Sequence, residues 1–379
     1  MRIPSPFLSC LGLALAICLI LPGCKTNSNP SPAGALPPKA ADRGRLAEAD
    51  AIIAAQTRIM EQDDRNADAY YLRGMAYVQK ELYDKAKEDF DQAVTMNPRH
   101  WAAILNRGVI EGVRGFNDAA IKDLNMAIII NDAHAEAFFN RGLILGQMGY
   151  YRRALEDLNQ AIVLNPKYAK AYTYRGRLWM LENEFAQALS DFDRSLEYNP
   201  GNTPALFHRA LALEALGQDD QAIESLAKTI SAEPSHARAY YHRGLLLSKT
   251  GNFNSALKDL DHAVKLDPNF SRAFYARGLV NARLENYAAA KADYSDALKI
   301  LHLARHLSDS LLQKFLETNP WVPDALYHRA LAYRASAEYD KAMTDIRKAI
   351  ELAPDEAPYR ELMTRLEQDR QNTRKSPGR

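Results

Sequence analysis

Cysteine is almost absent from this chain. The 379 residues contain three cysteines, Cys10, Cys18 and Cys24, and none lies beyond position 24. A thiolate nucleophile, a cysteine-held metal and an internal disulfide all need cysteines in the folded part of the chain. These three kinds of chemistry are therefore excluded from residues 25–379.

An excess of one charge and known catalytic motifs are also lacking. Lysine and arginine number 48 against 47 acidic residues, so the chain lacks the basic character that nucleic-acid binding requires. G-x-S-x-G, P-loop and H-E-x-x-H motifs do not occur. His302 and His306 have the i, i+4 spacing of one helix face, but no third ligand accompanies them. We expect no metal, no cofactor and no nucleic-acid partner.

Only one long apolar run occurs, at the N-terminus. Residues 10–21 follow Arg2 and are too few to span a bilayer as a helix, which needs about 20 residues, but they fit a secretory signal. The run ends in Leu21-Pro22-Gly23-Cys24, which resembles a bacterial lipobox and implies a signal peptide at 1–23 and lipid on Cys24. By the same resemblance, Lys25 favours release to the outer membrane. The alternative is an ordinary cleaved signal with an incidental cysteine.

The remainder of the chain is dominated by a repeated phrase, an arginine followed by glycine or alanine. The arginines recur every thirty-four positions, with one gap of fifty-two: Arg73, Arg107, Arg141, Arg175, Arg209, Arg243, Arg277 and Arg329. An alanine always stands thirteen positions after the arginine, and a large apolar residue stands seventeen positions after it. A fixed period of this length predicts a solenoid of helical hairpins.

This pattern resembles the tetratricopeptide repeat. The family's aromatic, small and proline positions are matched in the first unit by Tyr70, Gly74, Tyr77, Ala86, Phe90, Ala93 and Pro98. The resemblance implies an all-α fold, a right-handed α-solenoid of about eight helix-turn-helix repeats with capping helices. The expected repeats are residues 67–98, 101–132, 135–166, 169–200, 203–234, 237–268, 271–302 and 323–354.

Each arginine has an acid at a fixed distance along the chain. Sixteen positions later stand Asp89, Asp123, Asp157, Asp191, Ser225, Asp259, Asp293 and Asp345, with serine the one exception. This pattern fits either an ion pair repeated inside every hairpin or a row of ligand-binding arginines. We favour the ion pair, because a row of ligand sites has no need of a matched acid at each step. Arg209, which faces Ser225, would use Glu224 or an acid of a neighbouring repeat.

The flanking segments differ in composition from the repeats. Residues 24–44 read as a proline- and serine-rich linker, 45–62 as a capping helix, 356–370 as a C-terminal cap and 371–379 as a disordered tail. The longer gap between the last two arginines places an insertion at 303–322, either a binding element or a packing spacer. No glycine or proline interrupts residues 288–319, which favours one long helix or two collinear helices. A break with a new helix capped at Ser308–Ser310 is the alternative.

The resemblance implies that partners bind a concave groove lined by the first helices. The position two residues before each arginine lines this groove. The aromatic residues proposed there as partner contacts are Phe139, Phe207, Tyr241 and Tyr275. Packing between repeats explains these aromatics equally well. Basic residues gather in repeats six and seven, with a histidine just before one of the arginines. These candidate contacts are Arg238, His242, Lys249, Arg272 and Arg283.

These features predict a non-enzymatic adaptor in the bacterial cell envelope. We expect it to be held in the outer membrane by lipid, to face the periplasm and to bind proteins or peptides in the groove. Relatives with this layout suggest cell-wall enzymes, proteases, or secretion and pilus components as partners. The alternative is a cell-wall hydrolase that uses groove carboxylates, and a converging pair of acids would favour it.

Overall fold

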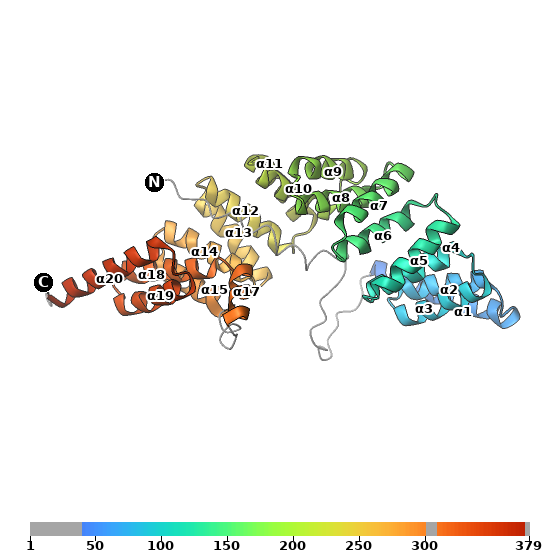
Figure 1. Ribbon diagram of the computed structural model, residues 1–379, viewed down its shortest axis with the longest axis horizontal. Helices are drawn as coiled ribbons and strands as arrows, with labels where there is room; N and C mark the ends of the chain where they lie inside the picture. Colours follow the sequence, from blue (N-terminus) through green and yellow to red (C-terminus); the bar gives the residue numbers. More distant parts are fainter. Residues whose placement is uncertain (1–39, 301–308, 376–379) are drawn as a thin grey trace. The chain divides into compact units, whose positions relative to one another are not determined.

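The computed structural model describes residues 40–300 and 309–375, which form helices joined by short turns (Figure 1). These residues contain nineteen α-helices, one short 3-10 helix and no strand. They fall into two compact units, residues 40–200 and 201–375, called here the N-terminal and C-terminal units. Cys24, His302 and His306 lie outside the described residues.

The N-terminal unit contains one capping helix and four hairpins. Its helices are α1 (Ala40–Gln62), α2 (Ala67–Gln79), α3 (Tyr83–Met96), α4 (Trp101–Val113), α5 (Asn117–Ile130), α6 (Ala135–Gln147), α7 (Tyr151–Leu164), α8 (Ala169–Leu181) and α9 (Phe185–Tyr198). α1 begins at Ala40 rather than at residue 45. Pro38 is the last proline of the N-terminal linker, and the residues that follow it favour a helix.

The C-terminal unit contains four hairpins, the insertion and the C-terminal cap. Its helices are α10 (Thr203–Ala215), α11 (Asp219–Ala232), α12 (Ala237–Lys249), α13 (Phe253–Leu266), α14 (Ser271–Arg283), α15 (Tyr287–Ala297), η2 (Leu298–Ile300), α17 (Asp309–Thr318), α18 (Val322–Ala335), α19 (Tyr339–Leu352) and α20 (Ala357–Lys375).

Two predictions about this unit need correction. One uninterrupted helix over 288–319 is wrong, because α15 ends at Ala297 and a 3-10 turn buries Leu298 against Val322 and Leu326 of α18. The disordered tail predicted at 371–379 begins too early, since α20 continues to Lys375. An ion pair of 2.8 Å between Arg370 and Asp340 holds its last turns.

Small residues allow the two helices of a hairpin to approach closely. The alanine that stands thirteen positions after each arginine is fully buried in all eight hairpins. The aromatic residues at the large apolar position, Phe90, Phe192 and Tyr294, each face a glycine of the first helix. A Cβ atom on Gly74 would lie 2.6 Å from Phe90 Cε1. In these three hairpins the glycine after the arginine is therefore required by packing.

The arginine that precedes this glycine joins the two helices of its hairpin. In seven hairpins its guanidinium donates two hydrogen bonds to the aspartate of the second helix, as in Arg107, whose Nε and Nη2 lie 2.7 and 2.8 Å from the Asp123 oxygens. The hydrogen bond to Asp123 raises the pKa of Arg107. The ion-pair interpretation is confirmed for these hairpins. Arg209 donates to Ser225 Oγ at 2.6 Å, whereas Glu224 binds Lys228.

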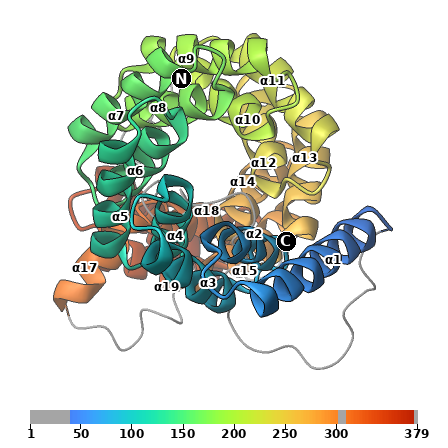
Figure 2. The same cartoon turned by 90° about the vertical axis from the view of Figure 1, so that its right-hand side faces the viewer.

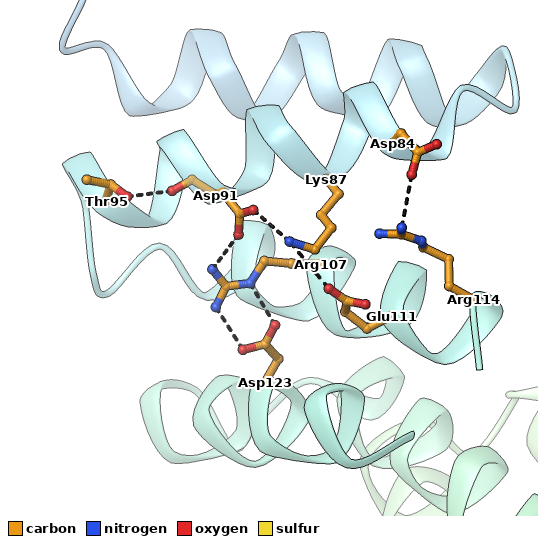
Figure 3. Close-up of polar contacts among 8 residues, drawn as sticks. All are labelled: Asp84, Lys87, Asp91, Thr95, Arg107, Glu111, Arg114 and Asp123. Atoms are coloured by element: carbon orange, nitrogen blue, oxygen red, sulfur yellow. Dashed lines mark hydrogen bonds and ion pairs between the residues drawn. The ribbon is translucent and has the colours of Figure 1, made fainter. Parts of the chain in front are cut away.

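The same arginines also contact the preceding hairpin, which the sequence analysis did not predict. Arg107 Nη1 lies 2.9 Å from Asp91 of α3 (Figure 3). Equivalent third bonds run from Arg73 to Thr57, Arg141 to Asn125, Arg175 to Asn159, Arg277 to Asp261 and Arg329 to Ser295. Arg243 departs from the pattern, since the equivalent residue is Ala227. One guanidinium thus fixes both the hairpin and its stacking on the hairpin before.

The two acids that share Arg107 should contribute unequally to stability. The Asp123 side chain is 13% exposed and that of Asp91 is 40% exposed. We expect Asp123→Ala to lower the free energy of unfolding by about 2–3 kcal/mol, because it leaves a desolvated guanidinium without its main partner. Asp91→Ala should cost less than about 1 kcal/mol, because solvent screens that pair. Urea unfolding measures both, and equal losses would contradict this account.

Candidate functional site

In each unit the first helices of successive hairpins form one face, and the second helices form the opposite face (Figure 2). Consecutive first helices also contact one another, as α4 contacts α6 and α12 contacts α14. We call this surface the first-helix face. It holds every partner-binding residue that the sequence analysis proposed.

The aromatic candidates on this face pack between hairpins. Each lies against a ring that stands just before, or at the start of, the next first helix. The ring centroids are 5.0 Å apart for Phe139 and Tyr168, 4.6 Å for Phe207 and His236, 4.8 Å for Tyr241 and Phe270, and 5.6 Å for Tyr275 and Trp321. Burial raises the pKa of Tyr275. Packing between repeats, one of the two interpretations offered for these residues, is what the geometry shows.

The sequence contains a signal for this packing that the sequence analysis did not use. An aromatic residue or a histidine precedes the first helix of six hairpins: His100, His134, Tyr168, His236, Phe270 and Trp321. Because these residues recur at the same position, each marks the second ring of a pair that joins two hairpins. Whether any of these aromatics also contacts a partner stays a prediction.

The basic candidates have different surroundings. Lys249 forms an ion pair with Asp219 at 2.6 Å, and Arg272 donates to the carbonyl oxygen of Thr318 at 3.1 Å. Arg272 thereby holds the C-terminal end of α17, so the inserted helix is attached to the start of α14. Both cations are thus engaged within the C-terminal unit.

Two other cations are more open to solvent. Arg238 is exposed, and its guanidinium lies 5.4 Å above the centre of the Phe207 ring. Arg283 is exposed at the last turn of α14 and forms no ion pair within residues 40–300 and 309–375. His242 is less open to solvent than these two arginines. It is half-buried, and its Nδ1 lies 3.2 Å from a Glu214 carboxylate oxygen.

The carboxylates of the first-helix face bond to separate partners. Asp68 lies 3.1 Å from His100, and Asp324 accepts a hydrogen bond of 2.6 Å from the Tyr359 hydroxyl. Glu214 pairs with His242. Each of these three acids therefore has its own partner, and no two of them share one. In the described part of the chain, no group of three or more histidine, cysteine or acidic side chains is arranged to hold a metal. None of the described helices is both long and apolar enough to cross a bilayer.

His328, the residue just before Arg329, packs among aromatic rings. Its ring centre lies 6.2 Å from those of Tyr275 and Tyr294. Burial lowers the pKa of His328 to about 4, against the opposing influence of Asp324. The imidazole is therefore neutral at physiological pH and lies half-buried against rings of α14 and α15.

These observations define a class: a solenoid of helical hairpins stacked through shared arginines and aromatic pairs. Tetratricopeptide repeat models match residues 180–246, 237–270, 271–300 and 323–356. A model of the N-terminal ARM repeat of tetratricopeptide repeat protein 21 matches residues 39–189. The chain is a tetratricopeptide repeat protein.

Several solved structures are similar to this chain at low sequence identity. Pseudomonas aeruginosa pilF is 20% identical over 54% of this chain and 93% of its own, with a TM-score of 0.50. A tetratricopeptide repeat protein of Parabacteroides merdae is 20% identical over 66% of this chain and 98% of its own, with a TM-score of 0.48. YrrB, a repeat protein with an unusual peptide-binding site, is 22% identical over 50% of this chain and 98% of its own, with a TM-score of 0.44. No curated protein matches the chain.

Because His328 is neutral in the fold, acid should destabilise the C-terminal unit. Between pH 6.5, the usual histidine value, and about 4, the unfolded chain binds a proton that the folded chain does not bind. Stability should therefore fall as the pH drops through this window, by up to about 3 kcal/mol from this residue. In His328→Leu that share of the pH dependence should disappear. Urea midpoints at pH 7 and pH 4.5 measure the difference, and parallel losses in parent and variant would contradict it.

Proposed function

We propose that this protein is a lipid-anchored scaffold of the bacterial envelope that binds protein segments on its first-helix face. Support for binding comes from the family, since tetratricopeptide repeat scaffolds bind proteins or peptides and are typically not enzymes. Support for the anchor comes from the N-terminal sequence, in which residues 10–21 lead to Cys24. An outer-membrane location facing the periplasm follows from the lipobox and Lys25 as part of this proposal.

The binding site is best supported in the C-terminal unit. The observation that carries this choice is Arg283, which is an exposed cation on the first-helix face with no acid bonded to it among the described residues. Arg238, on the same face, lies over the Phe207 ring. Leu245 and Leu279 are partly buried between these positions. Cations beside apolar surface suit an acidic segment of a partner that also carries apolar side chains.

The hydrolase alternative gains no support from the geometry. General acid–base hydrolysis of a glycosidic bond uses two carboxylates that flank the same bond. On the first-helix face Asp68, Glu214 and Asp324 each bond to a different neighbour. We therefore propose cell-wall enzymes, proteases, or secretion and pilus components as partners of the scaffold, and no reaction of its own.

Anchoring should depend on a single sulfur atom. Cys24→Ser removes the thiol that accepts lipid, so the variant should lack the lipid-modified N-terminal peptide in mass spectra. The parent should carry diacylglycerol on Cys24 and fractionate with outer membranes. An unmodified Cys24 in the membrane-bound parent would refute the anchor.

Binding should depend on the exposed cations of the first-helix face. The parent protein, captured from detergent-solubilised membranes, should bring down a discrete partner. Arg238→Glu with Arg283→Glu should weaken this capture at least about tenfold at low salt and less at high salt, because exposed charges are screened over about 10 Å at 0.1 M.

A matched control carries the same change of charge on the opposite face. Lys258 and Lys265 are exposed on the second helix α13, so Lys258→Glu with Lys265→Glu should leave capture unchanged. Circular dichroism confirms that both variants fold. Equal capture by the parent and both variants would show that the partner binds elsewhere.

A further inference from the structure

The residue just before each second helix changes in character along the solenoid. In the first three hairpins it is a large apolar residue that is exposed: Leu82 at 40%, Phe116 at 55% and Tyr150 at 50%. In the five later hairpins the same position holds Glu184, Gln218, Asn252, Asn286 and Glu338. The exposed apolar residues at this position are therefore confined to the N-terminal unit.

The turns hold these three side chains in fixed directions. The residue before each of them has a left-handed backbone, with φ of 58° at Glu81, 85° at Gly115 and 84° at Gly149. The amide of each apolar residue then closes the preceding helix, donating to Tyr77, Glu111 and Leu145 at 2.9, 2.8 and 2.9 Å respectively. This bond, together with the left-handed residue before it, satisfies a carbonyl group at the helix end. The apolar tips are thus displayed by the fold itself.

The three turns lie along one edge of the N-terminal unit. Arg114, at the end of α4, forms an ion pair of 3.1 Å with Asp84, at the start of α3 (Figure 3). The same guanidinium lies 5.3 Å from the centre of the Phe116 ring. Met148, in the third turn, packs against the core cluster that contains Ala120 of α5. We call the turns at residues 80–85, 114–119 and 148–153 the turn edge.

The turn edge also differs in charge from the turns that follow. It contains five basic residues, Lys80, Lys85, Arg114, Arg152 and Arg153, against three acidic ones, Glu81, Asp84 and Asp118. Three of these cations also form surface ion pairs: Lys80 with Asp50, Arg114 with Asp84 and Arg152 with Glu156. The next four turns, at residues 182–187, 216–221, 250–255 and 284–289, contain five acidic residues and no basic one. Apolar side chains flanked by cations suit a surface with an apolar interior beneath an anionic outer layer.

We propose that the turn edge contacts the surface of an anionic phospholipid bilayer. Leucine and aromatic side chains on turn tips enter the headgroup region, and neighbouring cations meet lipid phosphates. The location rests on the proposed anchor. Residues 25–39 separate Cys24 from α1 and extend at most about 50 Å, and α1 packs against α2 in the same unit. A lipid on Cys24 would therefore keep the first three hairpins within reach of the membrane.

The test uses protein without lipid, so that binding by the turn edge is measured alone. The chain from Lys25 onward keeps every described residue, and circular dichroism verifies its helical content. We expect it to co-sediment with vesicles of phosphatidylethanolamine and phosphatidylglycerol, and less with vesicles of phosphatidylcholine. Leu82→Ser, Phe116→Ser and Tyr150→Ser together should lower the partition coefficient at least about tenfold, because all three apolar tips are lost.

A control variant separates apolar contact from overall charge. Leu82→Glu, Phe116→Glu and Tyr150→Glu add three negative charges to the turn edge, whereas Gln218→Glu, Asn252→Glu and Asn286→Glu add the same charge at equivalent positions of later hairpins. The first set should abolish sedimentation, and the second should change it less than about twofold.

Three outcomes would overturn the proposal. They are a parent that does not sediment with anionic vesicles, equal losses in the two glutamate variants, and a parent that forms a dimer which the serine variant dissociates. The third outcome would assign the edge to a second copy of the chain. An unlipidated Cys24 in cells would refute the anchor but would leave the vesicle result standing, so the two failures are distinguishable.

Discussion

The structure depends on a repeated arginine whose guanidinium bonds to two neighbouring hairpins. Each of these arginines is bonded to the side chain of its own second helix, and most are also bonded to an oxygen of the helix before it, as Arg107 is to Asp123 and Asp91. A lysine cannot replace it, because its three donors sit on one nitrogen and lack the planar fork that pairs with a carboxylate on one side and reaches the preceding helix on the other. Because the fork fixes the distance and the rotation between neighbours, it sets how the first helices line up. The first-helix face and the turn edge both follow from that register.

The repeats and the ion pair were predictable from the sequence because both depend on fixed spacing. The regular period identifies hairpins whatever their surface residues, and an acid sixteen positions after an arginine falls on the facing helix. The third bond was missed, although its signal was present: a polar residue eighteen positions after the arginine, as in Asp91, Asn125 and Asp261. A contact between two hairpins can be predicted only when their stacking is known. The spacing within one repeat does not give that stacking.

The first-helix face was less predictable for the same reason. Tyr275 and His328 occupy positions that line the inner face of such repeats, but Trp321 of the insertion packs on the Tyr275 ring, and both Tyr275 and His328 are partly buried. Arg272 similarly binds the carbonyl oxygen of Thr318, a contact that depends on where α17 ends. The long helix predicted through this region failed because Leu298 is held by the core of the next hairpin. Tertiary contacts between repeats, rather than propensity, decided each of these cases.

The central claim is that the first-helix face of the C-terminal unit binds a protein segment, and in vivo photo-crosslinking tests it most directly. A photoreactive phenylalanine analogue in place of Arg283 or Leu279 probes this face, and one in place of Lys258 probes the opposite face. The account predicts that the first two positions yield the same discrete adduct and that the third does not. Adducts from the second-helix position alone, or the same adducts from all three positions, would contradict it.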